Sequence, residues 1–74
     1  MGEASKYKLY QTVQLARDVM KEGLMAGAVG TIVLVHELPY TAYEVEFTDE
    51  YGRTLAQVTL LEEELYCAPG NSLD

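Results

Sequence analysis

The chain has 74 residues, of which 49% are apolar, and its 12 Asp and Glu residues outnumber its five Lys and Arg residues to give a formal charge of -7. A chain of this length holds one domain with one small core, and its apolar fraction is too high for a wholly disordered protein. The negative charge disfavours sequence-independent nucleic-acid binding and attraction to an anionic membrane, because both depend on an excess of Lys and Arg.

Neither end of the chain carries a periodic apolar pattern. The N-terminal stretch MGEASKYKLYQ is polar, so we expect residues 1–9 to be a mobile segment, residues 10–67 to be the single domain and residues 68–74 to be a mobile tail. The longest apolar run, residues 32–35, is too short to cross a bilayer. Because the N-terminus does not resemble a signal peptide, the expected location is the cytoplasm.

The segment from residue 8 to residue 22 fits two secondary structures. Four apolar residues recur at helical spacing, namely Leu9, Val13, Ala16 and Met20. Gly23 could cap such a helix. However, residues 12–15 alternate as a strand does, and Leu15 and Val19 would lie outside the apolar stripe of the helix. The residues alone leave both alternatives open.

A β-branched run follows this ambiguous segment. Residues 31–35, TIVLV, are too few for an independent helix and predict a strand that is buried on both faces for part of its length. Gly27 and Gly30 are expected to bracket the turn before it. Pro39 ends the run, because proline cannot donate to a strand ladder.

The clearest pattern is a β-hairpin followed by one helical turn. In AYEVEFTD the inward residues are Tyr43, Val45 and Phe47, and the outward residues are Glu44, Glu46 and Thr48. In the return strand TLAQVTL the inward residues are Ala56, Val58 and Leu60, and the outward residues are Leu55, Gln57 and Thr59. Gly52 falls where the turn DEYGR needs a positive φ. The segment LEEEL predicts a single helical turn that places Leu65 over the open end of a barrel.

The order AGAVGTIV, AYEVEFTDEYGRTLAQVTL and EEEL resembles a family of short, largely uncharacterised bacterial proteins with an SH3-like barrel. The resemblance covers residues 10–66 and implies a mainly β fold, a small antiparallel barrel of about five short strands with one short helical turn near the C-terminus. It also implies that residues 12–15 form a strand. The Gly-x-x-Gly turn is similar to that of KOW modules of ribosomal proteins and transcription factors, but those modules carry basic loops that this sequence lacks.

Carboxylates and tyrosines on and around the predicted hairpin form the candidate partner-binding set. Its members are Glu44, Glu46, Asp49, Glu50, Tyr40, Tyr51, Glu62 and Glu63. Glu44 and Glu46 share a strand face because they are two residues apart. Such a pair can act as an acid and a base or hold a cation, but the commoner role is a solvated strand face that discourages aggregation. Tyrosine is favoured at interfaces because it combines a large rigid area with a polar tip.

Residues with catalytic or metal-binding chemistry lack suitable neighbours in the sequence. The only histidine, His36, is expected at the surface near a strand end, because Glu37 would point to the opposite face. Residues 49–52 lack the ligand spacing of an EF-hand and predict a turn. The single cysteine, Cys67, predicts an ordinary thiol. We therefore expect no catalytic residue, no metal site and no cofactor.

Three functions are compatible with these patterns. The first is a non-catalytic module that binds a protein, in particular a basic one, as an immunity protein or antitoxin does. The second is a structural subunit or homo-oligomer associating through strand edges, with an apolar interface drawn from Leu24, Met25, Leu55 or Tyr40. The third, which the overall charge disfavours, is a nucleic-acid module that uses Lys6, Lys8 and Arg17.

Overall fold

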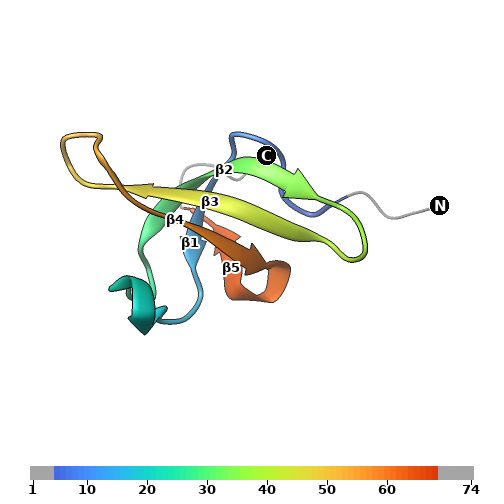
Figure 1. Ribbon diagram of the computed structural model, residues 1–74, viewed down its shortest axis with the longest axis horizontal. Coiled ribbons are helices and arrows are strands. Elements are labelled where there is room, and N and C mark those ends of the chain that lie inside the picture. The colour runs from blue at the N-terminus through green and yellow to red at the C-terminus, as the bar shows by residue number, and fades with distance from the viewer. Residues whose placement is uncertain (1–4, 69–74) are drawn as a thin grey trace.

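A single antiparallel sheet of five strands, with two short 3-10 turns, makes up the part of the chain that the computed structural model describes, residues 5–68. The strands are β1 (Thr12–Leu15), β2 (Val29–His36), β3 (Ala42–Thr48), β4 (Thr54–Leu61) and β5 (Leu65–Cys67), and the turns are η1 (Met20–Glu22) and η2 (Glu62–Glu64). Their order across the sheet is β4-β3-β2-β1-β5 (Figure 1). The predicted mainly β fold is confirmed, with its five short strands and the helical turn near the C-terminus.

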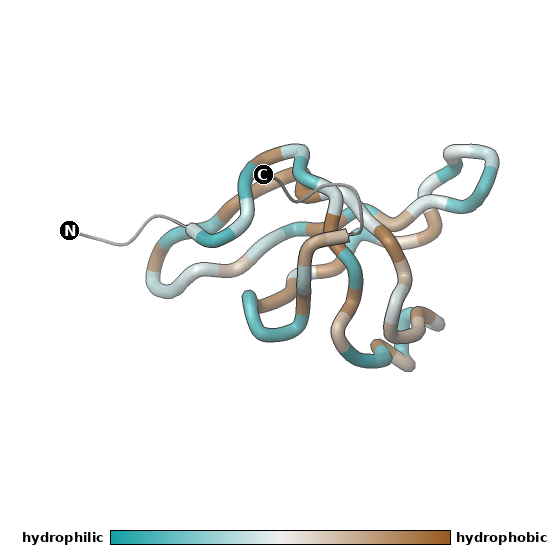
Figure 2. Tube along the Cα trace, turned by 180° about the vertical axis from the view of Figure 1, so that it is seen from behind, coloured by the Kyte–Doolittle hydropathy of each residue, from teal (hydrophilic) through white to brown (hydrophobic). Residues whose placement is uncertain are grey.

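The β3–β4 hairpin has the predicted inward and outward faces. Tyr43, Val45 and Phe47 are buried, whereas Glu44 and Glu46 between them are only partly covered. Gly52 has the predicted positive φ, 83°. The hairpin is long and its tip projects from one end of the molecule (Figure 1), where the chain is mostly hydrophilic (Figure 2). The apolar side chains of the hairpin therefore face the core while the carboxylates remain at the surface.

The core is assembled from all five strands and from segments outside them. Its buried apolar members are Tyr7, Val13, Leu15, Leu24, Ile32, Tyr43, Val45, Phe47, Leu60 and Leu65. Leu65 directly follows η2 and is buried, as the sequence predicted. The packed domain begins before residue 10 and extends past residue 67, the two predicted boundaries, because Tyr7 is 1% exposed and Ala68 is 4% exposed. The remainder of the predicted mobile ends, residues 1–4 and 69–74, lies outside the described residues.

The two glycines expected to bracket the turn before β2 have different roles. Gly27 adopts a φ of 92° in the turn itself. Gly30 lies inside β2, opposite Phe47, where a Cβ atom would be 2.7 Å from Val45 Cγ1 and 2.8 Å from Phe47 Cε1. The prediction that Gly30 bounds the turn is therefore wrong. A glycine is needed there because β3 packs against the β2 backbone.

Strand β2 contains an irregularity that the sequence pattern did not indicate. Ile32 pairs with Val45 and Leu34 pairs with Glu44, so Val33 between them has no partner in β3. Such a bulge reverses the side-chain alternation of the strand. Ile32 consequently faces the core, whereas Leu34 is 49% exposed. The prediction that this run is buried on both faces for part of its length is wrong, because Ile32 is the only buried residue among residues 31–35.

Candidate protein-binding surface

Two of the predicted carboxylates lie side by side on the exposed face of the β2–β3–β4 part of the sheet, which we call the outer face. Glu44 lies between Leu34 of β2 and Thr59 of β4, and Glu46 lies between Thr31 and Gln57. Their positions follow from the alternation of β3, whose other side chains fill the core. The outer face therefore carries two acidic groups at its centre, among polar side chains and the half-exposed Leu34.

Glu44 is held by hydrogen bonds from both neighbouring strands. His36 Nε2 lies 2.9 Å from Glu44 Oε2, and Thr59 Oγ1 donates to the same oxygen at 2.8 Å. The bond to His36, followed by that to Thr59, lowers the pKa of Glu44 below its usual 4.5. A hydrogen bond to an ionised carboxylate favours the charged form. Glu44 therefore stays negatively charged in a fixed orientation at neutral pH.

Glu46 is held from one side, since Thr54 Oγ1 donates a hydrogen bond to its Oε2. Thr54 is the first residue of β4. Glu46 and Glu44 are thus both oriented by hydroxyl groups of β4, and their side chains lose little further freedom when a partner binds. Preorganised groups of this kind bind more tightly than freely rotating ones.

The hairpin tip is organised around Asp49. Its Oδ1 accepts hydrogen bonds from the backbone N–H groups of Tyr51 at 2.8 Å and Arg53 at 2.9 Å, and its Oδ2 accepts one from Arg53 Nε at 2.8 Å. The backbone bond from Arg53 is the main cause of a lowered pKa at Asp49. Asp49 therefore stabilises the predicted turn. Glu50 next to it is exposed and is free of these contacts.

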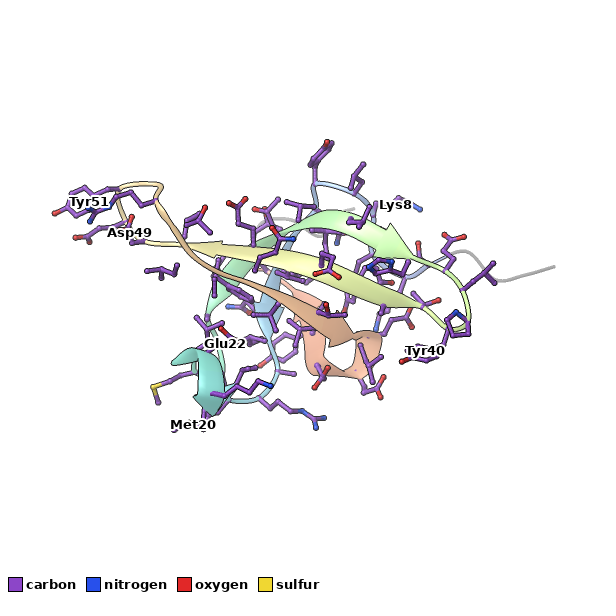
Figure 3. All side chains as sticks on the ribbon, viewed as in Figure 1. Lys8, Met20, Glu22, Tyr40, Asp49 and Tyr51 are labelled. Atoms are coloured by element: carbon purple, nitrogen blue, oxygen red, sulfur yellow. The ribbon has the colours of Figure 1, made fainter. Side chains whose placement is uncertain are left out.

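Tyr40 and Tyr51 stand at the two ends of β3. Tyr40 is 63% exposed in the loop before the strand, and Tyr51 is 74% exposed at the hairpin tip. The side chains of these two tyrosines lie at opposite ends of the molecule (Figure 3). The Arg53 guanidinium lies over the Tyr51 ring, 5.2 Å from its centroid. The two aromatic groups thus flank the outer face rather than meeting in one patch.

The carboxylates of η2 do not form one continuous group with Glu44 and Glu46. Glu62 Oε2 accepts hydrogen bonds from the backbone N–H of Lys6 at 3.1 Å and from Tyr43 Oη at 2.9 Å. Glu64 Oε1 accepts one from the backbone N–H of Leu61 at 2.8 Å. These two glutamates hold the fold together, and Glu63 is the exposed member of the run.

The Tyr43 hydroxyl links Glu62 to the N-terminal segment. It accepts a hydrogen bond from the backbone N–H of Tyr7 at 3.1 Å, and the two rings pack edge to face with centroids 5.6 Å apart. The Tyr7 hydroxyl donates to the carbonyl of Leu65 at 3.1 Å. Burial is the main cause that raises the pKa of Tyr43 above 10.0, and Glu62 raises it further. The hydroxyl therefore remains protonated and acts as both donor and acceptor.

Charge is unevenly divided between the two parts of the chain. Residues 37–64 carry eight carboxylates and one basic side chain, a formal charge of -7, whereas residues 5–36 carry four basic side chains and two carboxylates, a formal charge of +2. The acidic part comprises β3, β4, the hairpin tip and η2. The basic part comprises the N-terminal segment, β1, η1 and β2. The charged groups that a partner meets when it approaches the hairpin are therefore almost all negative.

The sequence matches the family profile described as a domain of unknown function, DUF4926, over residues 9–67. The chain belongs to the DUF4926 family. Searches of curated proteins and of solved structures found no match to this DUF4926 chain. None of the helical turns within residues 5–68 is long and apolar enough to span a membrane. Over the same residues, the DUF4926 domain has no pocket and no group of three or more His, Cys, Asp and Glu side chains placed to hold a metal ion.

The contact between His36 and Glu44 in this DUF4926 domain is not apparent from the sequence. The sequence predicts His36 at the surface without a carboxylate partner, because Glu37 next to it would point to the opposite face. The bulge at Val33 places His36 on the outer face, and the register of β2 on β3 brings it to Glu44. A polar residue at the end of an otherwise apolar strand is the one signal that could have suggested a cross-strand partner.

Proposed function

We propose that this chain is a non-catalytic protein-binding module that receives a basic protein on the outer face and the adjoining hairpin tip. The single observation that carries the proposal is the segregation of charge, with a formal charge of -7 over residues 37–64. Glu44 and Glu46 at the centre of that region are held in fixed orientations by neighbouring side chains. Ionised groups fixed in this way attract a positive surface and reject a negative one.

The two parts of this surface contribute in different ways. Complementary charge speeds the encounter of two proteins and suppresses wrong partners more than it raises affinity. Exposed aromatic side chains supply most of the affinity at interfaces of this kind. Tyr40 and Tyr51 are such side chains, and their places at the two ends of β3 suit a partner that lies along the strand. An immunity protein or antitoxin, which covers the basic surface of another protein, is the concrete form of this function that we favour.

We further propose that the fold is an SH3-like barrel. The strand order β4-β3-β2-β1-β5 and the one-turn η2 between β4 and β5 support this assignment. Barrels of this kind often serve as interaction modules, although a fold alone does not define a function. The assignment therefore adds to the argument from charge without replacing it.

The test compares two variants with the same net charge. Glu44→Gln combined with Glu46→Gln removes two negative charges from the outer face and keeps oxygen acceptors for His36 and Thr54. The control, Glu22→Lys, changes the net charge by the same two units at an exposed site in η1. Tagged forms of the wild type and of both variants are used to capture proteins from the native cell at low salt. The affinity of each captured protein is then measured with purified components.

We expect the captured partner to be basic, and we expect the double variant to bind it roughly tenfold more weakly while Glu22→Lys binds nearly as the wild type does. Binding should also weaken as the ionic strength rises from about 0.05 M to about 0.5 M, because exposed charges are screened. A partner whose affinity is insensitive to both salt and the double substitution would refute the proposal.

A further inference from the structure

Strand β4 is an exposed edge of the sheet. It pairs with β3 on one side and, within the described part of the chain, with no strand on the other. An edge strand presents unpaired N–H and C=O groups, and proteins commonly protect such edges with charged residues, proline or a bulge. The eight residues of β4, TLAQVTLL, include neither a charged residue nor a proline. Its one irregularity is at Leu55, which has no partner in β3.

The charged residues that flank β4 are of opposite sign at its two ends. Arg53 directly precedes the strand, and its side chain is 74% exposed even though Nε is bonded to Asp49. Glu63 lies in the turn that follows the strand and is exposed. Two copies of β4 in parallel would bring like charges together. Two copies in antiparallel orientation would bring the Arg53 end of β4 in each copy next to the other end of β4 in its partner, where Glu63 lies in η2.

We propose that two copies of this chain associate by antiparallel pairing of β4 with β4, centred near Val58. The two copies would be related by a two-fold axis normal to the sheet. Both copies would then use the same edge, so the assembly stops at a dimer. It also joins the two five-stranded sheets into one, with both outer faces on the same side. The uncharged strand supplies the backbone hydrogen bonds. The arginine and glutamate at its ends select the antiparallel orientation.

The first measurement is the mass of the purified wild-type chain in solution over a wide range of concentrations, by sedimentation velocity. We expect a monomer–dimer equilibrium with no species larger than a dimer. Amide hydrogen exchange is measured at both ends of that range. We expect protection to increase with concentration at alternate residues of β4, because only every second N–H of an edge strand points away from the sheet.

Gln57→Lys tests the pairing without threatening the fold of the single chain. Gln57 is exposed and lies opposite Glu46 of β3, so a lysine there gains an opposite charge within its own sheet. In the dimer, the two lysines would lie near each other close to the two-fold axis. We expect dimerisation to weaken by roughly tenfold, as like charges at an interface repel. The matched control is Gln14→Lys, because β1 is paired on both sides.

A charge exchange tests the orientation. Glu63→Arg should weaken the dimer because it places two arginines together, and Arg53→Glu added to it should restore the wild-type dimerisation constant. Circular dichroism establishes that each variant is folded. A wild type that stays monomeric at all concentrations would overturn the proposal. So would a dimer that Gln57→Lys and Glu63→Arg leave unchanged, or open-ended chains formed by pairing of β4 with the β5 edge of another copy.

Discussion

Replacing Gly30 with alanine tests how closely β3 packs on β2. An added Cβ would lie 2.7 Å from Val45 Cγ1, 2.8 Å from Phe47 Cε1 and 2.9 Å from the Glu46 carbonyl oxygen. Carbon atoms in van der Waals contact are about 3.5 to 4.0 Å apart, so all three neighbours would have to move. Val45 and Phe47 are buried in the core, and the Glu46 oxygen belongs to the backbone of a central strand. None of the three can retreat into solvent.

Two opposing effects determine the cost. Overpacking a tight core by one methyl group destabilises a protein by about 1 to 3 kcal/mol. Alanine restricts the unfolded chain more than glycine does, which stabilises the folded protein by about 0.4 to 1 kcal/mol. Because one of the contacts is with a backbone atom, we expect the overpacking cost of Gly30→Ala to lie near the upper end of its range. The net loss in the free energy of unfolding is then about 2 kcal/mol. A domain of this length has about 4 to 11 kcal/mol of stability, so the loss is a large share.

Urea unfolding followed by circular dichroism measures the free energy of unfolding. The matched control is Gly27→Ala, because an added Cβ there has nothing within 4 Å and the cost arises only from the φ of 92°. We expect the control to lose about 1 kcal/mol. If Gly30→Ala were as stable as the wild type, or more stable than Gly27→Ala, then β3 would not be tightly packed on β2 and the reasoning would be refuted.

Two further predictions concern the hydrogen-bonded side chains. Tyr43→Phe leaves the backbone N–H of Tyr7 without its acceptor and removes a donor to Glu62. It should therefore lower the free energy of unfolding in urea by about 1 to 3 kcal/mol. An unchanged free energy would contradict the stabilising role of the Tyr43 hydroxyl. The wild type should have a larger free energy of unfolding than Glu44→Gln above pH 4.5, because the folded carboxyl has a lowered pKa. This difference should disappear as the pH falls through that lowered pKa. A difference that stays constant down to about pH 3 would contradict the bond to His36.

Local alternation was sufficient to predict the β3–β4 hairpin. Apolar and polar residues alternate strictly from Tyr43 to Phe47, and this alternation allows only one assignment of inward and outward side chains when one face of the strand must be buried. Gly52 marks the turn between the two strands. The positions of Glu44 and Glu46 on the outer face followed from the same alternation. Features that depend only on neighbours along the chain were therefore accessible from sequence.

Features that depend on contacts between distant segments of the chain could not be predicted from the sequence. The pairing of His36 with Glu44 requires the bulge at Val33, and no residue type in TIVLV marks where a bulge falls. Tyr7 lies between two lysines, and the helical spacing of apolar residues begins only at Leu9, so no periodicity assigns Tyr7 to the core. Its burial depends on Tyr43 and Leu65, which are 36 and 58 positions away.

The position of Tyr43 has a consequence for how the chain is made in the cell. Its hydroxyl joins the backbone of Tyr7, 36 residues earlier, to Glu62, 19 residues later. A growing polypeptide that has left the ribosome only as far as β4 lacks both this carboxylate and the strand that completes the sheet beside β1. Long-range closure of this kind slows folding. Folding can therefore finish only after β5 has been synthesised, and fragments that end before β5 would be targets for proteolysis.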